Sequence, residues 1–279
     1  MDKLKTYLKH PLSFVLLILI GLASIINVAS IIFIIIYILV NGIPNLTTDL
    51  FSLHYNSKNQ SMLPSIFNTV FITFLTLLIA VPIGIFSAVY LVEYAKKGSK
   101  LVKVIRVTTE TLAGIPSIVF GLFGFLAFVI ALGWGYSMIA GVLTLVMMVL
   151  PTIIRTTEEA LLAVPNSYRE GSFGLGAGKI RTIFKIIVPT AIPGILSGVI
   201  LAIGRIVGET AALIYTSGTV AETATSLTDS ARTLSVHLYC LLSEGLFTNQ
   251  AYATAVILLL LVVGINALSN FIAKKLAKK

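Results

Sequence analysis

The chain has 279 residues, of which 57% are hydrophobic and 11% are charged, and its formal net charge is +9. An ordinary soluble domain has about 25% charged residues. With a mean hydropathy of +1.00, this composition excludes a soluble globular domain. It predicts an all-α integral membrane protein with several spanning helices.

Six apolar runs are comparable with the roughly 20 residues that a helix needs to cross the hydrocarbon core. The third and fourth runs are separated only by Gly133–Tyr136 (GWGY), which predicts a tight turn with an aromatic anchor at the interface. The first run lacks a small-x-small cleavage site, so we expect it to be retained as a helix. The six predicted spans are Leu12–Val40, Ile66–Val92, Leu112–Leu132, Met138–Ile154, Ala191–Ser217 and Tyr252–Ile272.

Lysine and arginine residues concentrate in alternate connections, and the remaining connections contain only Lys58 and Arg232. The positive-inside rule therefore predicts that both termini are cytoplasmic. Because the charges flank several membrane segments, they argue against one basic domain that binds nucleic acid. We divide the chain into an N-terminal helix with the first outer loop (1–65), a transmembrane domain (66–272) and a basic cytoplasmic tail (273–279).

The residues that usually carry enzyme chemistry are sparse. Cys240 is the only cysteine, so no intramolecular disulfide is possible, and His10, His54 and His237 lack metal-ligand spacing. Neither an HExxH nor a GxSxG motif is present. We therefore predict no catalytic residue and no metal site in this chain.

Two outer connections, 41–65 and 218–249, are longer than the topology requires. Each presents a surface to a partner outside the membrane or is an ordinary variable loop, and the sequence leaves both interpretations open.

The cytoplasmic loop 155–190 is more informative. Its helical pattern stops at Pro165 and restarts at NSYRE, where Asn166 or Ser167 is expected to cap a short helix that the following glycines end. The segment Gly174–Lys179 (GLGAGK) is not a phosphate-binding loop, because such a loop needs GxxxxGK and then Ser or Thr after a strand. Any ATP must therefore be bound by another subunit.

Two charges lie in the fifth predicted span. Arg205 and Glu209 are four residues apart, so on a continuous helix they share one face and are able to pair. Each charge costs about 2.5–3.5 kcal/mol at the bilayer centre, which favours burial in a bundle or a pathway. The predicted face is small and polar, and consists of Gly194, Gly198, Arg205, Glu209, Ala212 and Thr216.

The second and third spans contribute further candidates. Thr69, Thr73 and Thr76 share one helical face, and their hydroxyls either line an anion path or form ordinary interhelical hydrogen bonds. Pro116 predicts a kink in the third span, flanked by Glu110 and Ser117, which serves as a hinge, a path lining or a simple packing feature.

The cytoplasmic loop resembles the EAA motif of permease subunits of bacterial ABC importers. The departures from the common motif are Gly171-Ser172, where two alanines are usual, and Val188, where leucine is usual. The resemblance implies that this loop is a coupling helix that docks in a groove of an ATPase subunit. The matching residues are Glu170, Gly171, Ser172, Gly176, Ile186 and Pro189.

Four segments narrow the resemblance to permeases of bacterial phosphate importers. They are VPIGIFSAVYLVEY (81–94), LAGIPSIVFGLFGF (112–125), LPTIIRTTEEALLAVP (150–165) and GRIVGETAAL (204–213). The resemblance implies the type I permease fold in the cell membrane, a sister permease, two ATPase subunits that bind ATP and Mg²⁺, and an extracytoplasmic phosphate-binding protein. The resemblance is to one of the two permeases of such an importer; the sister permease shares weaker forms of these segments and is the alternative.

The resemblance also suggests a role for the charges of the fifth span. Arg205 either attracts or gates phosphate, with Glu209 holding its guanidinium, or the two form a structural ion pair. Thr216, Ser117 and the three threonines of the second span complete the candidate pathway. A permease for another oxyanion, a secondary transporter and a channel are the alternatives, although no internal repeat supports a secondary transporter.

Overall fold

The computed structural model describes residues 11–96 and 98–277, and within these residues the chain contains helices and loops but no strand. The long helices are α2 (Pro11–Gly42), α3 (Leu63–Val89), α6 (Met138–Leu162), α9 (Val188–Val207) and α12 (Thr248–Ala277). The shorter helices are α4 (Lys100–Ala113), α5 (Ser117–Gly124), α7 (Asn166–Gly174), α8 (Lys179–Thr182), α10 (Ala211–Thr216) and α11 (Leu234–Glu244). Three π-helical turns, η3 (Tyr90–Tyr94), η4 (Phe125–Ala131) and η5 (Ile183–Ile187), and two 3₁₀ turns, η1 (Ile43–Asn45) and η2 (Thr48–Phe51), complete the described elements.

The predicted number of spans is confirmed by length and composition. Among the described residues, five helices are long and apolar enough to cross a membrane, and a sharply bent pair makes a sixth. The first, second, fourth and sixth predicted spans correspond to α2, α3, α6 and α12.

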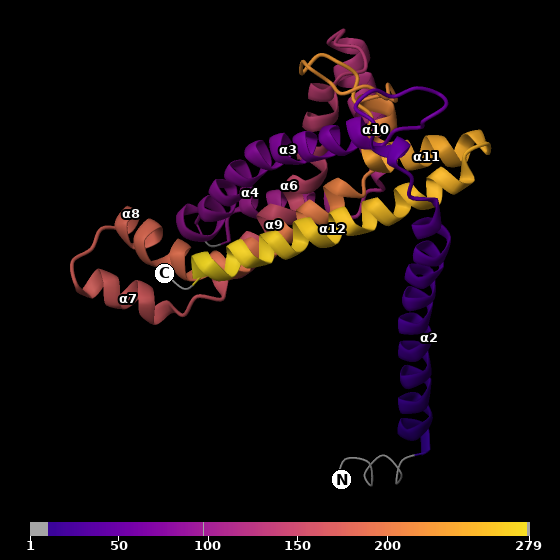
Figure 1. Ribbon diagram of the computed structural model, residues 1–279. Helices are drawn as coiled ribbons and strands as arrows, with labels where there is room; N and C mark the ends of the chain where they lie inside the picture. Colours follow the sequence, from indigo (N-terminus) through magenta and orange to yellow (C-terminus); the bar gives the residue numbers. More distant parts are fainter. Residues whose placement is uncertain (1–10, 97, 278–279) are drawn as a thin grey trace.

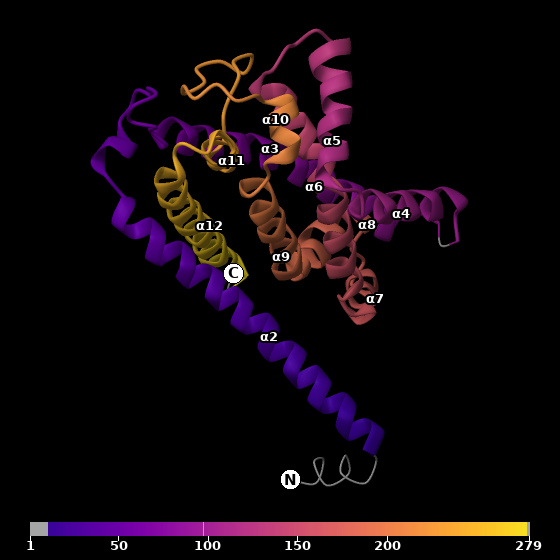
Figure 2. The same cartoon turned by 90° about the vertical axis from the view of Figure 1, so that its right-hand side faces the viewer.

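The third span differs from its prediction. A kink was expected within a span running over 112–132, but α4 and the segment formed by α5 and η4 meet at 102° across the break at 114–116. Pro116 is extended (φ −58°, ψ 141°) because proline cannot continue the hydrogen-bonded helix. The two arms therefore run in different directions (Figure 2), and only together do they reach the length and apolar character of a span.

The fifth span is not one continuous helix over 191–217, so that prediction was wrong. α9 ends at Val207 and α10 starts at Ala211. The Glu209 carboxylate accepts a hydrogen bond from the backbone N–H of Ala212 at 3.0 Å, which satisfies one of the free donors at the start of α10. Arg205 and Glu209 consequently belong to different helices.

The bundle is built from α3, α6, α9 and α12, and α2 leaves it at a wide angle (Figure 1). α2 contacts α12 near its own C-terminal end, where the Tyr37 and Tyr252 hydroxyls lie 3.3 Å apart. The large apolar side chains along α2, from Leu12 to Val40, are mostly exposed. In water such a surface is unfavourable, so α2 must be covered by lipid or by another subunit.

Small residues set the close helix contacts inside the bundle. A side chain on Gly194 would lie 2.6 Å from the Cβ of Ala160, and one on Gly84 would lie 2.5 Å from a methyl group of Ile153. These glycines let α9 and α3 approach α6 closely, which suits membrane helices that pack by van der Waals contact.

The two ends of the bundle carry different structures. α7 and α8 project as a hairpin at one end, and α10 and α11 lie toward the other (Figure 1). α11 lies within the connection that was expected to be an outer loop, so this connection is partly helical. Thr233 caps its start by accepting from the Val236 N–H, and Gly245 ends it with φ +69°.

Candidate functional site

Arg205 lies in the last turn of α9 and is half-buried. Its side chain forms no ion pair with a carboxylate of the described residues. The residue borders a cavity of about 540 Å³ between α6, α9 and α12. The cavity is lined by Thr152, Ile200, Leu201, Gly204, Arg205 and Asn266.

Asn266 is a polar residue of this cavity that the sequence analysis missed. Its Oδ1 atom is buried and has no hydrogen-bond partner in the described part of the chain. A buried amide oxygen without a partner is unfavourable, so the atom requires a donor from a ligand, water or a rearranged side chain. Two asparagines, Asn266 and Asn270, interrupt the apolar run of α12, and the first of them was the signal that could have identified it.

Glu209 does not hold the Arg205 guanidinium as predicted. It is 8% exposed, and its carboxylate accepts from Ala212 at the start of α10. Its backbone oxygen also accepts a 2.6 Å hydrogen bond from the Ser235 hydroxyl of α11. Glu209 therefore organises the break between α9 and α10, and Arg205 keeps its guanidinium donors available.

The predicted small and polar face of the fifth span is divided between two environments. Gly198 packs against Thr156 of α6, so this part of the face is closed. A side chain on Gly204 would meet no atom within 4 Å, and one on Gly208 would meet only the Gly204 carbonyl at 3.5 Å. The face beside Arg205 is thus open in this subunit.

The threonines of α3 lie in the interior of the subunit. Thr69 donates to the Ser65 carbonyl at 2.6 Å and accepts from the Leu234 N–H at 2.8 Å, which joins α3 to α11. Thr73 donates to the Thr69 carbonyl at 2.7 Å. The Thr76 hydroxyl is buried and has no partner among the described residues.

The remaining pathway candidates are also separate from Arg205. Thr216 is fully buried and donates to the Ala212 carbonyl at 2.8 Å, and Ser117 is half-buried at the start of α5. None of the other six predicted pathway residues lines the cavity of Arg205. The structure therefore disperses the predicted pathway set over the bundle.

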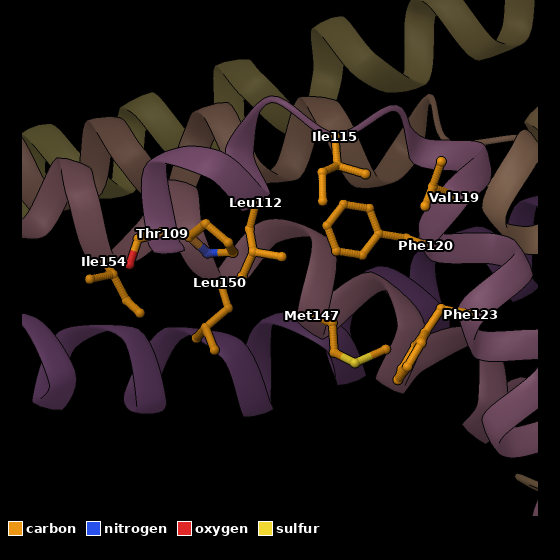
Figure 3. Close-up of a pocket in the computed structure, with 10 residues that line it drawn as sticks. Thr109, Leu112, Ile115, Val119, Phe120, Phe123, Met147, Leu150 and Ile154 are labelled. Carbon is orange, nitrogen blue, oxygen red and sulfur yellow. The ribbon is translucent and has the colours of Figure 1, made fainter. Parts of the chain in front are cut away.

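A second cavity, of about 390 Å³, lies in the elbow between α4, α5 and α6. Figure 3 shows Leu112, Ile115 and Phe120 around this space, together with Phe123 and Met147. The lining is almost entirely apolar, and the hydroxyl of Thr109 already donates to the Ile105 carbonyl at 2.6 Å, so the cavity is poorly suited to an anion. Thr109 connects it to a smaller charged pocket that contains Glu110.

That charged pocket is lined by two arginines and three glutamates. Arg106 pairs with Glu158 across α4 and α6, and Arg155 pairs with Glu159 at 3.0 Å within α6. Each arginine is neutralised by the glutamate with which it pairs, and Glu110 adds a further negative charge. This pocket is therefore unsuited to an anion.

The predicted short helix of the EAA-like loop is confirmed as α7. Its N-cap position is Pro165, without a side-chain cap, so the predicted capping by Asn166 or Ser167 was wrong. Gly176 lies in the turn between α7 and α8 and has φ +79°, a backbone conformation that glycine adopts without strain.

The EAA-like residues are distributed between the surface and the interior of this hairpin. Glu170, Gly171, Gly176 and Pro189 are exposed, and Ile186 is half-buried. Ser172 is buried, and its hydroxyl lies 2.8 Å from that of Thr182 in α8.

Apolar side chains surround the exposed part of the motif. Tyr168 and Phe173 are each 49% exposed, Ile180 is 67% exposed and Leu175 is 91% exposed. A cluster of this kind on a projecting hairpin indicates a protein contact surface.

Comparison with known proteins identifies relatives of the class that the sequence resemblance implies, the permease subunits of ABC importers. Residues 80–279 match the family described as binding-protein-dependent transport system inner membrane component. The probable ABC transporter permease protein YqgI of Bacillus subtilis (strain 168) is 32% identical over 277 residues, covering 93% of this chain and 94% of that protein. The phosphate transport system permease protein PstA 1 of Mycobacterium tuberculosis (strain CDC 1551 / Oshkosh) is 45% identical over 140 residues, which is 50% of this chain and 45% of that protein.

The fold is also that of a solved transporter. The bacterial alginate ABC transporter, crystallised with an alginate pentasaccharide-bound periplasmic protein, matches with a TM-score of 0.71 over 98% of each chain. Its sequence identity of 15% limits this comparison to the fold. The chain belongs to the family of binding-protein-dependent transport system inner membrane components, as a multi-pass permease subunit of an ABC importer and not itself an enzyme.

Proposed function

We propose that this permease forms half of the transmembrane pathway for inorganic phosphate in an ATP-driven importer. Its partners are a sister permease, two ATPase subunits that bind ATP and Mg²⁺, and an extracytoplasmic phosphate-binding protein. The similarity to a phosphate transport permease supports the choice of phosphate. The exposed apolar residues of the α7 hairpin support docking of an ATPase, and the uncovered surface of α2 supports a neighbouring subunit or lipid.

The single observation that carries the choice of an anion is the environment of Arg205. A guanidinium within a membrane bundle is unfavourable without a partner, and Arg205 has no carboxylate partner among the described residues. It borders a cavity beside an open helix face, together with Thr152 and Asn266. A guanidinium binds phosphate through two parallel N–H donors, and the hydroxyl and the amide add further donors.

Substitution of Arg205 by glutamine tests this role. Charge-assisted hydrogen bonds contribute about 1.5–3 kcal/mol, so ATP-dependent uptake of labelled phosphate by the reconstituted complex should fall by about tenfold or more. Arg205→Lys retains the charge but loses the bidentate geometry, and should be intermediate. Lys58→Gln removes an exposed cation of a connecting loop and should leave uptake unchanged.

Two results would contradict the proposal. Wild-type uptake by an Arg205→Gln complex that retains its ATPase would exclude Arg205 as a phosphate-binding group. Inhibition of uptake by a small excess of another oxyanion, at concentrations where unlabelled phosphate has little effect, would assign the pathway to that oxyanion.

A further inference from the structure

Arg169 connects α7 to two other parts of the chain. Its guanidinium donates to a Glu93 carboxylate oxygen through Nε at 3.0 Å and through Nη2 at 2.6 Å. It also donates to the backbone oxygens of Leu161 and Val164 at 3.1 and 2.9 Å. One side chain of the hairpin thus contacts both η3, which ends the second span, and the C-terminal end of α6.

The geometry gives this contact a fixed orientation. The side chains of Arg169 and Glu93 are 17% and 10% exposed, so solvent screens their attraction less than it screens the Arg155–Glu159 pair, which is 59% and 62% exposed. The carbonyl groups of Leu161 and Val164 lie at a helix C-terminus, where a cation is favourable. Arg169 therefore has little freedom to move independently of η3 and α6.

A second contact joins the same parts. The Lys179 ammonium lies 4.6 Å from the centre of the Tyr94 ring, one residue beyond Glu93. α7 and α8 thus each place a cation on η3. A π-helical turn departs from the regular α-helical register and is frequent at functional sites.

The surroundings of η3 continue this connection into the bundle. The apolar cluster at this end joins Ala88 and Val89 of α3 to Leu161 of α6 and to Ile183 and Ile187 of η5. Next to this cluster, α3 packs along α6, with Gly84 against Ile153. A displacement of α7 that keeps the Arg169–Glu93 pair intact must therefore also displace the end of α3.

We infer that the Arg169–Glu93 pair is the link through which a movement of α7 reaches the second span. This inference rests on the proposed docking of an ATPase on α7. Arg169 and Glu93 are positioning residues, because neither is assigned a contact with the transported anion or with ATP. Without the pair, α7 still binds the ATPase through its exposed face, but its displacement is transferred less completely to α3.

The test measures the number of phosphate ions transported per ATP hydrolysed in the reconstituted complex. Glu93→Ala should retain the ATPase and its ATP hydrolysis but lower this ratio about fivefold or more, which is in the range of measured coupling between sites. Glu93→Gln keeps the shape and one acceptor oxygen, so it should fold normally and have a smaller effect. Glu159→Ala removes a carboxylate whose ion pair lies within α6, and should leave the ratio unchanged.

The outcomes distinguish a failure of the Arg169–Glu93 link from a failure of the proposed function. Failure of the wild-type complex to bind an ATPase or to transport phosphate would contradict the proposed function. If the wild-type complex does both, an unchanged ratio in Glu93→Ala and Glu93→Gln would overturn the link. A loss of uptake only in proportion to a loss of bound ATPase would also overturn it, because Glu93 would then only stabilise the docking surface.

Discussion

The two ends of the bundle differ in how far the chain itself supplies hydrogen-bond partners for their polar groups and covers their apolar side chains. At the α11 end, the connection after α10 is folded onto the chain itself. Asn68 of α3 donates to the Glu222 and Arg232 carbonyls at 2.9 and 3.2 Å and accepts from the Ala224 N–H at 3.0 Å. At the α7 end, the hairpin exposes large apolar residues such as Leu175.

The arginines of the two ends show the same contrast. Arg232, at the α11 end, is 8% exposed and has no carboxylate partner among the described residues. It donates to the Thr219 carbonyl at 2.7 Å, contacts His237 Nδ1 at 3.1 Å and lies 5.3 Å from the Tyr55 ring centre. Arg169, at the α7 end, pairs with Glu93. The connection at the α11 end is therefore held by hydrogen bonds within the subunit, whereas the α7 end carries the exposed apolar surface on which we propose that an ATPase docks.

The largest stability effect is expected from Asn68→Ala. The substitution leaves three backbone groups of the connection without their partner, and the free energy of unfolding should fall by about 3 to 5 kcal/mol. Thermal unfolding of the purified subunit in detergent would measure this loss.

Asn56→Ala is a matched control for Asn68. Asn56 accepts from the Lys58 and Asn59 N–H groups in an exposed turn, where water can replace it, so the loss should stay below about 1 kcal/mol. Equal losses in the two variants would show that the connection at the α11 end is no more tightly held than an ordinary surface turn.

A smaller effect is expected from pH, through His237. Burial, and then the positive charge of Arg232, lower the pKa of His237 from 6.5 to about 4. Between these pH values the unfolded chain binds a proton that the folded chain excludes, so stability should decrease as the pH falls from 6.5 to 4. The decrease should be at most about 3 kcal/mol.

The variant His237→Gln tests the assignment of this pH dependence. It removes the titrating group, so the thermal stability of the variant should vary less with pH between 6.5 and 4 than that of the wild type. An unchanged pH dependence would assign the effect to other groups, and would remove His237 from the features that make the α11 end self-contained.

Local signals in the sequence were sufficient for much of the fold. Each of the six apolar runs corresponds to a helix or to a bent pair, because a bilayer requires long apolar segments wherever the chain crosses it. The short helix after Pro165 was also predicted, and Pro116 was predicted as the position of a kink although not of a full break, since a proline ring is incompatible with the interior of a regular helix. α11 was missed, although Thr233 and Gly245 flank it as ordinary capping residues.

The break in the fifth span depends on contacts that are distant in sequence. No proline marks it, and it includes the hydrogen bond between Glu209 and Ser235, 26 residues away. The helical projection that paired Arg205 with Glu209 assumed a continuous helix and therefore failed. A projection of one helix also carries no information on its neighbours, so it did not show that Arg205 shares a cavity with Asn266 of α12.

The smallest stability effect is expected at the α7 end. Leu175 is 91% exposed, so Leu175→Ser should change the free energy of unfolding of the isolated subunit by no more than about 0.5 kcal/mol. If an ATPase covers this residue, the variant should nevertheless retain less ATPase when the complex is purified, because apolar contact area at the interface is lost. Leu246 follows α11 at the opposite end of the bundle and is 81% exposed, so it provides the control. Leu246→Ser should change neither the free energy of unfolding nor the retention of the ATPase. Equal retention of the ATPase by both variants would mean that the exposed apolar residue of the α7 hairpin is no more a contact surface than the one beside α11.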